Sequence, residues 1–121
     1  MISDKILLTC KELLKRSSHQ RYKFGCILVK KNRIISTGYN QLKTDPKSPH
    51  EYKMLHAEIH CLLRAPKNRI MGSPLFIYME KPNGKPGMSK PCPCCLEMLK
   101  NKGVKDITYV TTSGIFEQIL L

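Results

Sequence analysis

The sequence of 121 residues has few aromatic and few acidic side chains. It contains no tryptophan, and aromatic residues make up only 7% of it. Nine aspartates and glutamates stand against 21 lysines and arginines, which gives a net charge of +12. No apolar run approaches the roughly 20 residues of a membrane-spanning helix, and the run from Ile6 to Leu8 is too short for a secretory signal. We therefore expect a cytoplasmic protein.

The remaining composition fits a globular protein. Hydrophobic residues make up 41% and charged residues 25%, proportions that exclude a disordered chain. A chain of 121 residues can bury one compact core but is too short for two. We therefore expect residues 1–121 to form a single domain, without internal repeats.

The order of helix and strand patterns predicts the α/β class. Apolar residues recur at helical spacing over about 3–17, 55–65 and 93–102. Strand patterns cover residues 24–30, 33–38, 75–79, 106–111 and 115–121. The last two strands must pair antiparallel, because the turn Thr112-Ser113-Gly114 is too short for a parallel crossover. The predicted fold is one five-stranded mixed sheet with helices packed on it, in the order αββαβαββ.

Three of the six cysteines crowd into the run from Pro91 to Cys95. In a reducing compartment, cysteines are metal ligands or buried thiols more often than disulfides. Cys92 and Cys95 have C-x-x-C spacing at a predicted helix start, and His56 at another helix start offers a nitrogen. Three protein ligands leave one tetrahedral position open, as in a catalytic zinc site. Glu58 lies close enough in sequence to exchange protons with a water there.

These residues resemble the pattern of the zinc-dependent nucleobase deaminases, which is H-x-E followed by P-C-x-x-C. His56-Ala57-Glu58 and Pro91 to Cys95 match it without a gap. The predicted order of elements is also similar to the cytidine deaminase fold, over nearly the whole chain. The resemblance implies Zn²⁺ bound by His56, Cys92 and Cys95, with Glu58 as the proton shuttle in hydrolysis of a cytosine to uracil.

The resemblance also implies contacts with the substrate. Asn40, in Gly38-Tyr39-Asn40, is similar to the asparagine that contacts the sugar in many members. The backbone of Ala57 would face the base, and the carbonyl of Lys90, just before Pro91, would accept from the exocyclic amine. The C-terminal hairpin is similar to free cytidine deaminases and departs from deoxycytidylate deaminases, whereas His56 departs from cytidine deaminases of this length. The subfamily therefore stays open.

The positive charge indicates a phosphate-bearing partner. No acid occurs between Glu12 and Asp45, a stretch with eight lysines and arginines. A second basic group lies on the loop from Glu80 to Lys90, which we expect over the mouth of the site. The phosphate or nucleic-acid contacts that we expect are Arg21, Lys23, Lys81 and Lys85. A solvated surface that keeps a small protein soluble is the alternative.

Two classes of cytosine substrate are open. We place a free nucleotide or nucleoside slightly ahead of single-stranded DNA or RNA, because few aromatic residues are present to stack successive bases. A non-catalytic, zinc-stabilised nucleic-acid-binding module is the alternative from another class, and the intact Glu58 argues against it. A structural zinc with Cys94 or His60 as a fourth ligand is disfavoured, as is a dithiol redox pair. Assembly into a homo-oligomer is left open.

Overall fold

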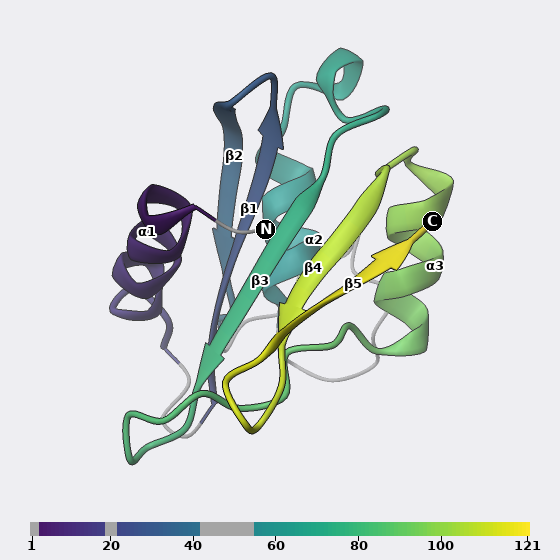
Figure 1. The fold of residues 1–121 in the computed structure, drawn as a ribbon. Coiled ribbons are helices and arrows are strands. Elements are labelled where there is room, and N and C mark those ends of the chain that lie inside the picture. Colours follow the sequence, from purple (N-terminus) through teal and green to yellow (C-terminus); the bar gives the residue numbers. More distant parts are fainter. Residues whose placement is uncertain (1–2, 19–21, 42–54) are drawn as a thin grey trace.

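A computed structural model of the chain describes residues 3–18, 22–41 and 55–121. These residues form a five-stranded sheet in the order β2-β1-β3-β4-β5 (Figure 1). The elements along the chain are α1 (Asp4–Leu14), β1 (Lys23–Lys30), β2 (Arg33–Tyr39), α2 (Ala57–Arg64), η1 (Lys67–Arg69), β3 (Leu75–Glu80), α3 (Pro93–Asn101), β4 (Asp106–Val110) and β5 (Phe116–Leu120). Strands β3 and β4 pair parallel and the other neighbours pair antiparallel, which confirms the predicted mixed sheet and its order of elements.

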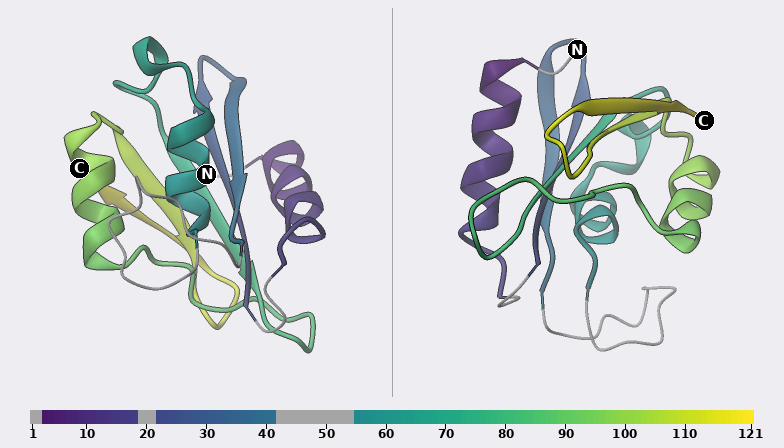
Figure 2. Two further views of the ribbon diagram at one scale, coloured as in Figure 1. Left: turned by 180° about the vertical axis from the view of Figure 1, so that it is seen from behind. Right: turned by 60° about the horizontal axis from the view of Figure 1, so that its bottom comes forward.

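Helices cover both faces of the sheet. Helix α1 lies on one face, and α2 and α3 lie on the other (Figure 2). In β1, Cys26 and Leu28 join the core with residues of α2, whereas Ile27 and Val29 join the core with residues of α1. Because successive side chains of a strand point to opposite faces, a strand buried on both faces reads as a continuous apolar run.

Helix α1 begins at the predicted cap and ends earlier than predicted. The Oγ of Ser3 accepts a hydrogen bond from the N–H of Ile6 at 3.2 Å. After Leu14 the chain tightens into turns, in which the N–H of Ser17 donates to the carbonyl of Leu14 at 3.2 Å. These turns place Ser17 beside Asn40, to which it donates a hydrogen bond.

The β1–β2 hairpin turns at Lys31-Asn32, as predicted. Both residues have positive φ angles, 51° and 64°, as the two-residue turn of a tightly twisted hairpin requires. The pairing register shifts by one residue between Leu28 and Val29, so that Gly25 lies opposite Tyr39. This bulge determines which β1 residues lie beside the end of β2.

Helix α2 packs closely on β2 at Gly38, and this contact positions the start of the helix. A methyl group at Gly38 would collide with backbone atoms of Ala57 and Cys61. The helix begins at Ala57 rather than at residue 55, because Leu55 pairs with Gln41 through two backbone hydrogen bonds of 2.8 and 2.9 Å. The closeness of helix and strand brings the first turn of α2 to the end of β2.

The C-terminal third follows the prediction. Pro93 lies in the first turn of α3, and Gly103 follows the helix with a φ of 88°. Strand β5 returns antiparallel along β4, which confirms the predicted hairpin. The short turn η1 was not predicted.

None of the helices in the described part of the chain is long and apolar enough to cross a membrane.

Candidate metal centre and active site

The N-termini of α2 and α3 carry the side chains that form the site. His56 is the N-cap residue of α2, and Cys92 is the N-cap residue of α3. N-cap side chains often bond to amides of the first helical turn, but neither of these two does so. Together with Cys95 they instead form a cluster whose ligand atoms all lie within 4.8 Å of one another.

The spacing within this cluster fits zinc. The Sγ of Cys95 lies 3.6 Å from the Nδ1 of His56. With Zn–S bonds of about 2.3 Å and Zn–N bonds of about 2.0–2.1 Å, two ligands of a tetrahedral ion stand about 3.6 Å apart. One nitrogen and two sulfurs leave the fourth position for water or substrate, as in catalytic zinc sites.

Two neighbouring residues stay outside the cluster. Cys94 is exposed and is not one of the three ligand residues. His60 packs edge-on against Tyr39, with ring centroids 4.7 Å apart, and its Nδ1 accepts a hydrogen bond from the N–H of Tyr39 at 3.2 Å. His60 therefore supports the end of β2 and is not among the three ligand residues, as expected.

Cys95 lies where a thiolate needs a cation. It is fully buried, and burial raises the pKa of its thiol far above the ordinary value, with further contributions from Glu58 and Cys92. Metal ions bind the thiolate and deprotonate a coordinating thiol outright. Metal binding at this site would therefore release protons, and the positive charge of the ion would stabilise the thiolate that burial otherwise disfavours.

Glu58 lies beside the cluster in the first turn of α2. Its side chain is 5% exposed. Burial raises the pKa of this carboxyl, while hydrogen bonds from its own backbone N–H and from the Cys95 thiol act in the opposite direction. A carboxyl whose pKa is raised is better suited to return the proton that it has accepted.

A cavity of about 250 Å³ lies beside the metal cluster. It is lined by Tyr22, Phe24, Asn40, His56, Ala57, Glu58, Lys90 and Cys92. The structure therefore brings Asn40, Ala57 and Lys90 to the wall that also holds Glu58. Pro91, which follows Lys90, is buried. The volume is below that of drug-sized pockets and suits a compact ligand.

The amide of Asn40 is held by three hydrogen bonds within the protein. Its Oδ1 accepts from the Oγ of Ser17 at 2.6 Å and from the N–H of Phe24 at 2.9 Å, and its Nδ2 donates to the carbonyl of Tyr22 at 2.6 Å. Asn40 is 1% exposed. It thus joins the end of α1, the start of β1 and the end of β2, and one Nδ2 hydrogen stays available for a ligand.

Sequence reasoning did not identify two aromatic residues of the cavity wall, Tyr22 and Phe24. Tyr22 immediately precedes β1 and Phe24 lies in it, and the bulge in the hairpin places this end of the strand beside Asn40. Antiparallel pairing of the two predicted strands would have indicated this neighbourhood. The exact pair of residues depends on the bulge, which has no clear sequence signal.

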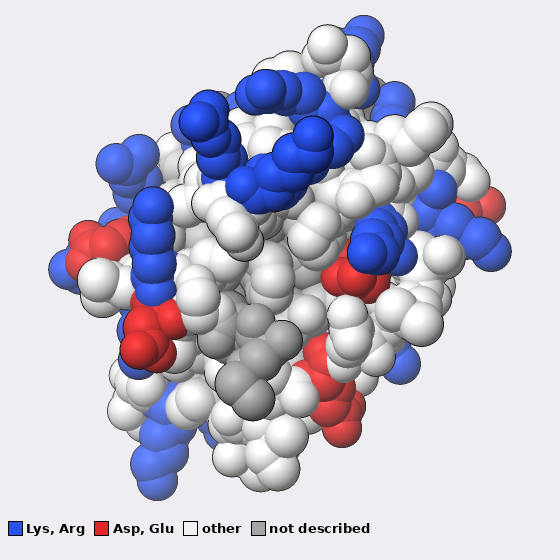
Figure 3. Space-filling view, turned by 45° about the horizontal axis from the view of Figure 1, so that its top comes forward, with Lys and Arg blue, Asp and Glu red and all other residues white. Residues whose placement is uncertain are grey.

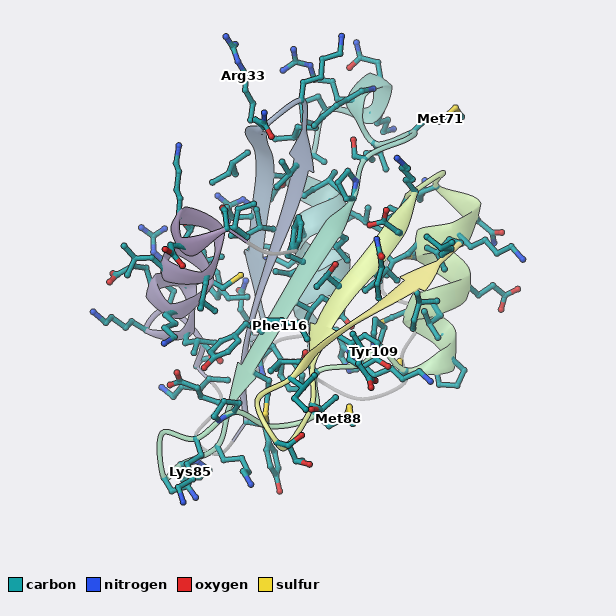
Figure 4. The ribbon with its side chains drawn as sticks, in the orientation of Figure 1. Arg33, Met71, Lys85, Met88, Tyr109 and Phe116 are labelled. Carbon is teal, nitrogen blue, oxygen red and sulfur yellow. The ribbon has the colours of Figure 1, made fainter. Side chains whose placement is uncertain are left out.

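The described lysines that were expected to contact phosphate do not line the cavity. Arg21 lies outside the described residues. Lys23 lies opposite Glu80 in the register of β1 and β3. The N–H of Lys81 donates to the carbonyl of Lys85 at 2.9 Å in a turn after β3. The described residues that line the cavity include Lys90 but not these three lysines. Lys85 lies at the outer tip of its loop (Figure 4).

Solved deaminase structures resemble this fold. The dCMP deaminase of cyanophage S-TIM5 has a TM-score of 0.67 and 29% sequence identity, over 94% of this chain and 90% of that chain. The cytidine deaminase of Burkholderia pseudomallei has a TM-score of 0.70 over 99% of this chain and 93% of that chain. At 15% identity, the second likeness is one of fold alone.

Curated proteins and family comparison agree with these structures. The deoxycytidylate deaminase of Schizosaccharomyces pombe is 28% identical to this chain, and the match covers 81% of this chain and 33% of that protein. The chain thus spans about a third of the length of this relative. Residues 2–111 match the family described as the cytidine and deoxycytidylate deaminase zinc-binding region. The match includes His56, Glu58 and both cysteines of the cluster, and the chain belongs to this zinc-binding deaminase family.

Proposed function

We propose that this chain carries the active site of a hydrolase that deaminates the cytosine of a free nucleotide. The observation that carries the proposal is the position of Glu58, a buried carboxyl that shares a small cavity wall with His56 and Cys92. A nucleotide is favoured because the cyanophage relative, 26% identical in its complex, was solved with dCMP and dUMP. These two nucleotides differ as the substrate and product of cytosine deamination differ, so deoxycytidine monophosphate is the substrate to test first.

The chemistry follows from the site residues. His56, Cys92 and Cys95 would hold Zn²⁺, which when bound would supply the activation of a water for attack on C4 of the base. Glu58 accepts a proton from that water and returns it to the departing amine. A C–O bond forms at C4, the C–N bond breaks, one water is consumed, and ammonia leaves.

The cavity wall would orient the nucleotide. Ala57, buried at the first position of α2, presents its backbone to the base, while the rings of Tyr22 and Phe24 provide apolar surface. The remaining Nδ2 hydrogen of Asn40 can donate to a sugar hydroxyl but cannot accept from one. Lys90 lines the cavity two residues before Cys92, and its carbonyl would accept a hydrogen bond from the exocyclic amine of the base.

A free cytosine nucleoside is the second candidate. It is favoured by the antiparallel pairing of β5 with β4, which is the hairpin arrangement similar to free cytidine deaminases. A nucleoside and its monophosphate present the same base and sugar to Glu58 and Asn40. Only the phosphate separates the two candidates.

The test is release of ammonia from a matched panel in the presence of zinc. The panel contains deoxycytidine monophosphate, cytidine monophosphate, both nucleosides and a single-stranded oligonucleotide with cytosine. We expect turnover of a monophosphate, and a loss of about 10²–10⁴-fold in kcat for Glu58→Gln with bound zinc retained. Glu97→Gln, which neutralises an exposed glutamate of α3, is the matched control and should leave turnover unchanged.

The outcomes separate the hypotheses. Faster turnover of a nucleoside than of its monophosphate would select the second candidate. Release from the oligonucleotide alone would overturn the proposal in favour of a deaminase of nucleic acid. A zinc-loaded protein that deaminates none of these compounds would contradict both candidates.

A further inference from the structure

A second hollow lies at the end of the sheet opposite the cavity. It has a volume of about 500 Å³ and is lined by Lys30, Lys31, Arg33, Ile35, Asn68 and Arg69. Lys31, Arg33 and Arg69 are exposed. We call Lys30, Lys31, Arg33 and Arg69 the basic end of the sheet. Figure 3 shows lysine and arginine side chains gathered around this part of the described surface, with no acidic side chain among them.

The basic end is made from two segments that are far apart in the sequence. Residues 13–44 contain no aspartate or glutamate, and neither do residues 59–79. The fold brings the β1–β2 turn of the first segment against η1 of the second, and the Nζ of Lys30 donates across the gap to the carbonyl of Met71 at 3.2 Å. The gathering of positive charge is therefore a result of the fold and goes beyond the basic run in residues 13–44.

No carboxylate within the described residues neutralises these cations. The ion pair that the described residues form joins Lys15 to Glu12 at α1, and neither residue lines the hollow. Exposed like charges repel one another, and this part of the surface gives Arg33 and Arg69 no acidic partner. Such a surface gains favourable interactions when phosphates from another molecule replace its counterions.

The form of the hollow favours a polymer over a single small anion. Three of its four cations are exposed, whereas a site for a small ligand places its polar groups in a mostly buried setting. The positive row continues with exposed Lys67 in the same turn as Arg69. None of the described residues that line the hollow is aromatic, so they offer phosphate contacts and no surface on which bases could stack.

We propose that the basic end binds the phosphodiester backbone of a nucleic acid, without recognition of its bases. Strand β1 separates this surface from the cavity, and its eight residues span roughly 23 Å. Figure 4 shows Arg33 and Lys85 at opposite ends of the molecule. Nucleic-acid binding at the basic end is therefore separate from the deamination proposed above and does not depend on it.

The experiment measures fluorescence anisotropy of a labelled oligothymidylate of about 20 nucleotides, which contains no cytosine. We expect the logarithm of the binding constant to fall linearly with the logarithm of salt concentration between about 50 and 200 mM. Charge reversal in Arg33→Glu/Arg69→Glu should weaken binding at least tenfold. It should also reduce the magnitude of the salt slope by about 1.4, because each lost phosphate contact contributes about 0.7 for a single strand.

The matched control is Lys81→Glu/Lys85→Glu, which makes the same change in net charge at the other end of the molecule. At about 0.1 M salt the Debye length is near 10 Å, so this variant should change binding less than about twofold. Equal weakening by both variants would overturn the proposal, because net charge alone would then explain binding. Weakening by the control variant alone would also overturn the proposal and would place the nucleic acid at the loop after β3.

Three further measurements complete the test. Labelled RNA and duplex DNA of the same length distinguish the sources of the phosphodiester backbone, and binding of any of them through Arg33 and Arg69 supports the proposal. Displacement of the oligonucleotide by equimolar inorganic tripolyphosphate would overturn it in favour of a small-anion site. No binding by the parent protein at about 50 mM salt would also overturn it. Unchanged thermal unfolding of Arg33→Glu/Arg69→Glu shows that the variant is folded.

Discussion

The two ends of the sheet differ in the burial and hydrogen bonding of their polar side chains. At the cavity end, Asn40 is buried with three hydrogen bonds, and Glu58 is buried beside the metal cluster. At the basic end, Lys31, Arg33 and Arg69 are exposed, and no carboxylate of the described residues pairs with them. Both ends are connected by the same strands, so the difference lies in the side chains and in the helices packed beside them.

This comparison shows which polar residues the fold depends on. A buried polar group that loses its partner costs far more than an exposed one, because water cannot replace the missing hydrogen bond. Substitutions at the cavity end should therefore change both stability and chemistry. Substitutions at the basic end should change interactions with other molecules and leave the fold intact.

The largest effect is expected for His56→Ala. This variant should lose bound zinc, because two cysteines alone leave the cluster without its nitrogen ligand. If the parent protein is saturated with zinc at about 1,000 times the dissociation constant, the loss corresponds to about 4 kcal/mol of stability. Metal analysis and thermal unfolding with and without a chelator measure the two effects.

His60→Ala is the matched control for this variant. His60 lies one turn further along α2 and contacts Tyr39 rather than the cluster. It should retain zinc, and its unfolding should still respond to the chelator. Full zinc content in His56→Ala would remove His56 from the metal site.

The next largest effect is expected for Asn40→Ala. This substitution leaves Ser17, the N–H of Phe24 and the carbonyl of Tyr22 without their bond to Asn40, at an expected cost of about 2–4 kcal/mol. Arg33→Ala removes an exposed polar side chain at the other end and should change stability by less than about 0.5 kcal/mol. Urea unfolding of both variants tests the comparison directly, and equal losses would contradict it.

Much of the fold and of the metal cluster was predictable from sequence. The continuous apolar run of β1 and the helical spacing in α1 follow from backbone geometry and burial, so they appear in a single sequence. The positions of His56 and Cys92 were predictable for another reason. Pro93 marks the start of α3 directly after Cys92, and the H-x-E and P-C-x-x-C spacings single out His56 and the two cysteines.

What the sequence could not show was the pairing of distant backbone segments. The bulge between Leu28 and Val29 shifts the register of the hairpin, and this shift determines that Phe24 bonds to the amide of Asn40. The basic end escaped prediction in the same way. Arg33 and Arg69 belong to separate segments, and only the packing of η1 beside the hairpin turn unites them.

Among the substitutions at the cavity end, the smallest effect is expected for Tyr78→Phe, in β3. The hydroxyl of Tyr78 donates to the Oε2 of Glu80 at 3.2 Å, and burial together with the charge of Glu80 raises the pKa of Tyr78 to about 12. Loss of one such hydrogen bond costs about 0.5–1.5 kcal/mol at neutral pH.

The pH dependence of that loss distinguishes the bond from simple packing. In the unfolded chain Tyr78 ionises near pH 10, so between about pH 10 and pH 12 the unfolded state binds fewer protons than the folded state. The contribution of Tyr78 to stability is therefore complete below pH 10 and is lost as the pH rises through 12. Urea unfolding between about pH 9 and pH 11.5 should show the parent protein losing its advantage over Tyr78→Phe. If the stability of the parent protein and that of Tyr78→Phe changed in parallel over this range, the folded state would not favour the protonated hydroxyl of Tyr78. The hydrogen bonding of polar groups at the cavity end would then not include Tyr78 of β3.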